Sequence, residues 1–149
     1  TVLAALFDPV EILRPGFPLH AELERLTAQA PGQGQARIIA LGANDGLRGL
    51  PLAQMRDNLN AMVNAARATG AKVLLAGIRL PPNYGPYAVE FHTSFSEIAR
   101  QQKVTLLEFL LAPIAAKQIY FQADNLHPTA EAQPLILEHV WPALAPLLR

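Results

Sequence analysis

Three short apolar runs, separated by segments of helical periodicity, constrain the fold of this chain most strongly. The runs cover residues 37–41, 72–76 and 104–109, and none alternates cleanly between apolar and polar positions. Strands of this kind are buried on both faces, as in a parallel sheet covered by helices. Residues 1–6 form a further candidate strand. The pattern predicts a three-layer α/β fold, a parallel sheet with helices on both faces.

Helices are expected where apolar residues recur at spacings of three and four, which holds for residues 18–30, 51–69, 87–102 and 129–148. Gly70 is placed to cap the second of these helices. Thr129 can cap the last one, and Pro142 is expected to bend or shorten it. Residues 46–50 and 80–86 are rich in turn formers and predict loops.

Composition bounds the class of protein. A chain of 149 residues predicts a single domain over residues 1–149, and 51% apolar against 16% charged residues excludes a disordered chain. Twelve basic and twelve acidic residues cancel, so no nucleic-acid partner is expected. We expect no integral membrane segment and no signal peptide in the chain shown, because neither a run of ~20 apolar residues nor a charged-then-apolar start occurs.

The segment Gly42-Ala43-Asn44-Asp45 follows the apolar run 37–41. Ligand sites of open parallel sheets gather at the carboxyl ends of strands. Gly42 permits a tight turn there, and the Asn44 amide can then donate to a tetrahedral oxyanion, an interaction worth roughly 2.7–4 kcal/mol. The alternative is a turn in which Asn44 and Asp45 satisfy local backbone groups only, and spacing alone favours it.

Asp124 and His127 lie three residues apart, so one helical or 3₁₀ turn can bring the carboxylate to the imidazole Nδ1–H. Nε2 is then left to act as a general base. The alternative is a surface histidine before Pro128, with Asp124 as a turn residue. Both interpretations stay open on these residues alone.

No metal or cofactor site is expected. The other histidines lack a second ligand four residues on, and there is no cysteine and no H-E-x-x-H string. The glycine patterns of nucleotide-binding loops are also missing from the sequence, so no cofactor is predicted. The histidines concerned are His20, His92 and His139.

Three segments together resemble the SGNH, or GDSL, hydrolase family, and within it the bacterial thioesterase/lysophospholipase/arylesterase branch. Residues 40–49 are similar to the third sequence block of that branch, residues 78–85 to its characteristic loop, and residues 121–128 to its fifth block. The similarity extends from about residue 26 to the C-terminus. It implies a flavodoxin-like sheet and hydrolysis of a small acyl ester or thioester.

The resemblance also implies roles for particular residues. His127 would be the general base, Asp124 its partner and Asn44 an oxyanion donor. Residues 46–50 and 80–85 would flank an acyl-chain groove, with substrate-binding positions at Gly42, Asp45, Leu47 and Leu80. Relatives in this branch are exported, which implies a periplasmic or secreted location. Nothing in the sequence predicts an oligomeric state.

The N-terminal part departs from the family pattern. The nucleophilic serine of the Gly-Asp-Ser block is expected after the first strand, but Pro9 stands at that position. Residues 9–37 are too few for the helix, strand, glycine loop and further helix of the family, so this part is shortened. The chain's serines, Ser94 and Ser96, fall inside the predicted helix 87–102 and are poor substitutes.

Three hypotheses follow. The first is an ester or thioester hydrolase of the SGNH type, impaired or incomplete in this exact chain because the nucleophile is missing. The second is a non-catalytic relative that binds acyl chains or lipids in the old groove. The third is a structural or assembly role, in which a partner chain covers the sheet edge that a missing strand leaves exposed.

Overall fold

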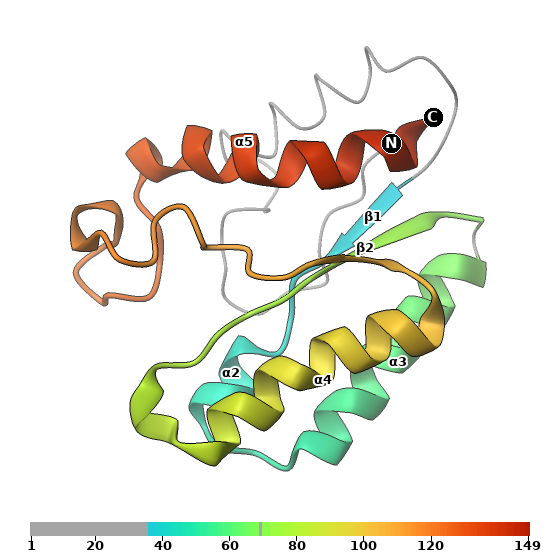
Figure 1. Cartoon of the computed structure of the whole chain (residues 1–149), viewed down its shortest axis with the longest axis horizontal. Helices are drawn as coiled ribbons and strands as arrows, with labels where there is room; N and C mark the ends of the chain where they lie inside the picture. The colour runs from blue at the N-terminus through green and yellow to red at the C-terminus, as the bar shows by residue number, and fades with distance from the viewer. Residues whose placement is uncertain (1–35, 69) are drawn as a thin grey trace.

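A computed structural model of the protein describes residues 36–68 and 70–149. The strand predicted over residues 1–6, the helix predicted over residues 18–30 and Pro9 lie outside these residues. Three strands form one sheet in the order β1-β2-β3, with both pairs parallel (Figure 1). They are β1 (Ala36–Ile39), β2 (Lys72–Ala76) and β3 (Thr105–Leu107). The predicted parallel sheet is therefore confirmed.

Helices cover both faces of this sheet. One face carries α3 (Leu52–Ala68) and α4 (Pro86–Gln102), and the other carries α5 (Gln133–Leu144) (Figure 1). The connections from β1 to β2 and from β2 to β3 run in the same direction across the sheet. Right-handed crossovers then place their helices on the same face. The shorter helical elements are α2 (Ala43–Leu47), η2 (Pro82–Tyr84), η3 (Gln118–Tyr120), η4 (Ala130–Ala132) and η5 (Ala145–Leu148).

Successive strand residues point to opposite faces and fill two separate cores. Ile38 and Leu74 pack in the core beneath α5, whereas Leu75 packs with Phe91 and Phe95 in the core beneath α3 and α4. The two phenylalanine rings meet edge to face, with centroids 5.3 Å apart. Each of these fully buried side chains stabilises the fold by roughly 1.5–3 kcal/mol. The three-layer prediction is thus confirmed in its packing as well as its topology.

Two local predictions need correction. Residues 46–50 were expected to form a loop only, but Gly46 and Leu47 belong to α2. The C-terminal helix begins at Gln133 rather than after Thr129, because the 3₁₀ turn η4 precedes it and Thr129 makes no capping hydrogen bond. Pro142 lies inside α5, which ends at Leu144 rather than near Leu148, so the helix is shortened as expected, and the 3₁₀ turn η5 continues the chain.

Gly77, directly after β2, lies against the backbone at the end of β3. Its N–H donates to the Leu107 carbonyl at 2.7 Å, and its carbonyl accepts from the Leu110 N–H at 3.0 Å. A Cβ atom on Gly77 would lie 2.3 Å from the Glu108 carbonyl oxygen. Only glycine permits this contact, since the obstacle is backbone that cannot move independently.

We expect Gly77→Ala to lower the free energy of unfolding by about 3 kcal/mol, because the new methyl group forces the two segments apart. Gly70→Ala is the matched control: Gly70 has φ +80° and open space around it. Its substitution costs only the left-handed backbone strain of about 1–2 kcal/mol. Urea denaturation measures both variants. An equal loss of unfolding free energy in the two variants would contradict the close approach of Gly77 to the Glu108 backbone.

Candidate active site

A cavity of about 430 Å³ lies at the carboxyl edge of the sheet. The segment after each strand contributes to it: Ala43 and Leu47 follow β1, residues 77–82 follow β2, and residues 109–111 follow β3. Residues 125–127 complete the lining from the C-terminal part. The cavity therefore occupies the position at which open parallel sheets bind their ligands.

The helix α2 brings Leu47 to this cavity. Gly42 precedes the helix with φ +104°, a conformation that glycine adopts without strain. Gly46 lies directly against the Phe91 ring, where an added Cβ would come within 2.5 Å of the ring. The Tyr84 hydroxyl donates to the Leu47 carbonyl at 2.8 Å. These contacts hold a helix of only five residues, which would not form by itself.

Tyr87 supports the chain that follows α2. Its hydroxyl donates to the Leu50 carbonyl at 2.6 Å. Burial raises the pKa of the Tyr87 hydroxyl above its ordinary value, and the negative charge of Asp45 raises this pKa further. The hydroxyl therefore stays protonated and able to donate throughout the physiological pH range.

A closed loop presents His127 to the cavity. Phe121 and Pro128 form an antiparallel bridge at its base, and the Gln122 N–H donates to the His127 carbonyl at 2.7 Å. Asn125 has φ +57°, a left-handed conformation that asparagine tolerates. The helical or 3₁₀ turn expected between Asp124 and His127 is thus replaced by a loop with a left-handed residue at its tip.

Asp124 organises this loop. Its Oδ1 accepts the backbone N–H groups of Leu126 at 2.9 Å and His127 at 3.0 Å, while its Oδ2 contacts the His127 Nδ1. The backbone N–H of His127 is the largest cause that lowers the pKa of the Asp124 carboxyl, followed by the His127 side chain and the Leu126 N–H. Since Nδ1 is engaged, Nε2 of His127 is the ring nitrogen left to serve a reacting group.

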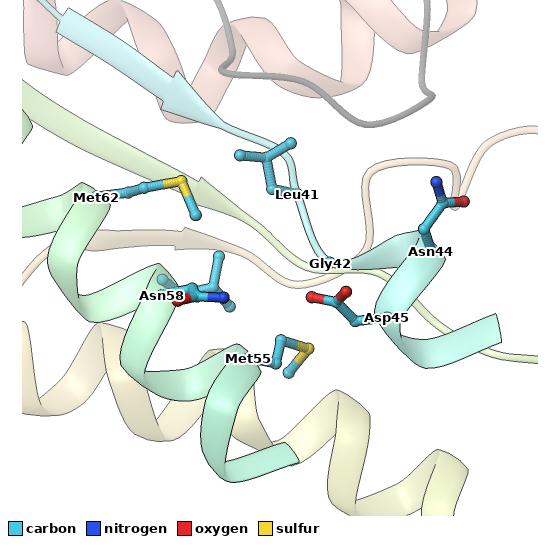
Figure 2. Close-up of a pocket in the computed structure, with 8 residues that line it drawn as sticks. Leu41, Gly42, Asn44, Asp45, Met55, Asn58 and Met62 are labelled. Carbon is cyan, nitrogen blue, oxygen red and sulfur yellow. The ribbon is translucent and has the colours of Figure 1, made fainter. Parts of the chain in front are cut away.

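The remaining predicted site residues divide between two cavities. Leu47 and Leu80 line the large cavity together with His127. Gly42, Asn44 and Asp45 instead line a smaller one of about 210 Å³ between the end of β1 and α3. In Figure 2, Asp45 points toward Met55 and Asn58, whereas the Asn44 side chain points away from them.

Ala43 and Leu47, which lie on either side of Asn44 in the sequence of α2, line the large cavity. The oxyanion-donor role of Asn44 stays a prediction, as do the substrate-binding roles of Gly42 and Asp45.

Two residues of the large cavity were missed by sequence reasoning. Arg79 and Phe109 both line it, and the Arg79 guanidinium lies 5.5 Å from the centre of the Phe109 ring. The one feature that could have identified them is their position, because Arg79 comes three residues after β2 and Phe109 two residues after β3. Only the pairing of the strands shows that these two ends meet.

The two serines have structural partners away from the large cavity. Ser94 is buried in α4, where its Oγ donates to the Glu90 carbonyl and accepts from Arg56 Nε, each at 2.8 Å. Ser96 donates to the Thr93 carbonyl at 2.9 Å. Neither serine lines the large cavity. In the described part of the chain, no group of three His, Asp or Glu side chains could hold a metal ion.

Comparison with known proteins shows the family. The sequence model of the GDSL-like lipase/acylhydrolase family matches residues 10–134. The chain is 52% identical over 112 residues to the esterase TesA of Pseudomonas aeruginosa, covering 74% of this chain and 56% of TesA. It is 42% identical over 104 residues to an arylesterase of Vibrio mimicus, covering 69% of this chain and 52% of the arylesterase. The chain thus spans just over half the length of these relatives.

Solved structures agree. A crystal structure of TesA matches with a TM-score of 0.71 and 46% identity, over 89% of this chain and 74% of that one. The esterase EstA from Pseudoalteromonas sp. matches with a TM-score of 0.70 and 39% identity, over 86% of this chain and 69% of that one. The chain belongs to the GDSL-like lipase/acylhydrolase family. Its resemblance to the SGNH thioesterase and arylesterase branch is confirmed.

The lowered pKa of Asp124 predicts a pH dependence of stability. A carboxylate with a lowered folded-state pKa stabilises the fold above the ordinary aspartate value of ~3.9, and this contribution is lost as the pH falls toward the folded-state pKa. We expect Asp124→Asn to be less stable than the wild type at pH 6, with a difference that shrinks below pH 4.

Urea denaturation between pH 6 and pH 3 measures this difference. Asp57→Asn, which alters an exposed carboxylate on α3, is the control and should show no such trend. A gap between wild type and Asp124→Asn that stays constant across this range would show that the carboxylate charge does not organise the loop.

Proposed function

We propose that this protein hydrolyses carboxylic esters or thioesters of acyl chains at the large cavity. His127 acts as the general base, Asp124 orients its ring through Nδ1, and Asn44 contributes to stabilising the oxyanion. The observation that carries the proposal is the Asp124–His127 pair at the edge of an apolar cavity of about 430 Å³. A base held in one orientation beside an acyl-binding space is one of the parts that acyl transfer requires.

The acyl chain of the substrate occupies the apolar part of the cavity. Leu80 and Leu110 are buried in its lining, and Phe109, Leu111 and Phe121 contribute further apolar surface. Each methylene group that enters such a space contributes about 0.8 kcal/mol. The relatives' names, esterase, arylesterase and thioesterase, support the same class of substrate.

The rate of this exact chain is proposed to be low. The two serines are bound within α4, and Pro9 stands where the family supplies its nucleophile. Without a nucleophile, His127 can only activate water, and general-base assistance of this kind contributes typically 10²–10⁴-fold. Covalent catalysis through a serine is not part of the proposed mechanism.

A second candidate function is acyl binding without turnover. The same absence of a serine from the cavity lining favours it. The two candidates differ in what His127 does: hydrolysis needs its free ring nitrogen, whereas binding needs only the apolar lining.

Hydrolysis of p-nitrophenyl butyrate by the purified chain tests the proposal. We expect slow turnover that falls at least roughly 10²-fold in His127→Ala, because the general base is lost. His92→Ala is the control, since His92 lies on α4 near Glu108 and does not line the cavity. Binding of the butyrate ester without any His127-dependent turnover would favour the second candidate over the first.

Intact-protein mass after treatment with a fluorophosphonate probe tests the serine-free mechanism. We expect an unchanged mass. A stoichiometric adduct would contradict the account, because it would show a reactive hydroxyl that the described residues do not supply.

A further inference from the structure

Gln122 holds the two peptide carbonyls that directly follow the Cα atom of His127. The Gln122 backbone N–H donates to the His127 carbonyl at 2.7 Å, and the side-chain Nε2 of Gln122 donates to the Pro128 carbonyl at 3.1 Å. Proline has no N–H, so the carbonyl is the backbone group that Pro128 offers for hydrogen bonding. One residue therefore engages two consecutive carbonyls next to the candidate base.

The backbone on both sides of these carbonyls is engaged as well. The His127 N–H donates to Asp124 Oδ1 at 3.0 Å, and the Thr129 N–H donates to the Tyr120 carbonyl at 2.8 Å. From the His127 N–H to the Thr129 N–H, each backbone donor and acceptor thus has a partner within the protein. A segment held at consecutive groups has few alternative conformations, so the direction of the His127 side chain is fixed by its backbone.

The contact between Asp124 and the imidazole ring is open to solvent. The Asp124 side chain is 42% exposed and the His127 side chain 22% exposed. Charge pairs that remain in contact with water contribute little by themselves, because water competes for both partners. Pro128 is buried, so the carbonyl that Gln122 binds belongs to a residue fixed by packing. His127 therefore has a solvent-exposed anchor on one side and a packed anchor on the other.

We propose that Gln122 is a positioning residue: its side-chain amide holds the Pro128 carbonyl and thereby keeps the His127 imidazole in the orientation in which Nδ1 meets Asp124 and Nε2 is left for the reacting group. The inference rests on the proposed function, since it concerns the orientation of the general base. Phe121 lines the large cavity, whereas Gln122 does not. Gln122 therefore acts through His127 and not on the substrate.

The chain offers matched variants for testing this role. Methionine is close to glutamine in length but has no N–H donor, so Gln122→Met removes the hydrogen bond to Pro128 with little change in shape. Gln118→Met is the control, because Gln118 Nε2 also donates within this loop, at 3.0 Å, but to the side-chain Oδ1 of Asn125. The control thus removes a hydrogen bond of the same kind that does not hold the backbone after His127.

Long-range ¹H–¹⁵N correlation spectra of the full chain measure the two neutral tautomers of the His127 ring. They are recorded at about pH 8, above the ordinary histidine pKa of ~6.5. In the wild type we expect the Nδ1–H tautomer, since Asp124 accepts at Nδ1. Gln122→Met should raise the ratio of the Nε2–H to the Nδ1–H form roughly three- to tenfold, the effect of one lost hydrogen bond. Gln118→Met should leave this ratio unchanged.

Gln122→Asn keeps the test available if Gln122→Met does not fold. Its amide sits on a side chain that is one methylene group shorter and no longer reaches the Pro128 carbonyl, so the tautomer ratio should shift in the same direction. A purely structural role is recognised by urea denaturation. A loss of unfolding free energy with an unchanged tautomer ratio would overturn the inference, as would an equal shift of the ratio in Gln118→Met.

Hydrolysis of p-nitrophenyl butyrate separates this inference from the function on which it rests. Where turnover depends on His127, Gln122→Met should lower kcat roughly three- to tenfold and leave KM unchanged, because the cavity lining is intact. A raised KM with unchanged kcat would overturn the positioning role. Turnover that does not depend on His127, together with the expected tautomer shift, would contradict the proposed function and still support the hold of Gln122 on the ring.

Discussion

The parallel pairing of β1, β2 and β3 is the constraint on which the site depends. Because all three strands run in the same direction, their carboxyl ends meet at one edge, and the segments that follow them lie side by side. Ala43, Gly77 and Phe109 reach the same cavity from sequence positions more than thirty residues apart for this reason. Gly77 permits the segments after β2 and β3 to lie together, since any side chain there would meet the Glu108 carbonyl.

The second requirement is a loop that brings His127 to this edge in a defined orientation. The Asp124 carboxylate satisfies two backbone N–H groups and the imidazole at once, so one side chain both shapes the loop and orients the base. The chain at and after α2 is also supported by side chains from elsewhere, because the hydroxyl groups of Tyr84 and Tyr87 donate hydrogen bonds to the backbone carbonyls of Leu47 and Leu50. In both places the support comes from residues that do not themselves line the cavity.

The sequence predicted the regular elements well where periodicity was strong. The boundaries of β2 agree with its apolar run, and α4 begins one residue before the predicted start, at Pro86. The contact between Asp124 and His127 was also predicted, because a spacing of three residues suffices for it. The helix α2 was missed because five residues carry no periodicity and its stability comes from distant residues, Phe91 and Tyr84 among them.

Membership of the cavity was only partly predictable. Leu47 and Leu80 were identified through the family resemblance, whereas Arg79 and Phe109 needed the strand register that brings β2 and β3 together. The loop around His127 depends on the bridge between Phe121 and Pro128 and on the left-handed Asn125, neither of which local spacing predicts. Residues whose placement rests on non-local contacts are thus the ones that sequence patterns leave open.

The central claim is that α2, which follows β1, and the His127 loop line one acyl-binding space. A fatty acid with a nitroxide on its chain tests it directly, by paramagnetic broadening of the backbone amide resonances. We expect a single bound ligand to broaden the signals of Ala43 and Leu47 together with those of Leu126 and His127. Broadening of only one of these two groups, at saturating ligand, would contradict a shared cavity and with it the proposed hydrolase site.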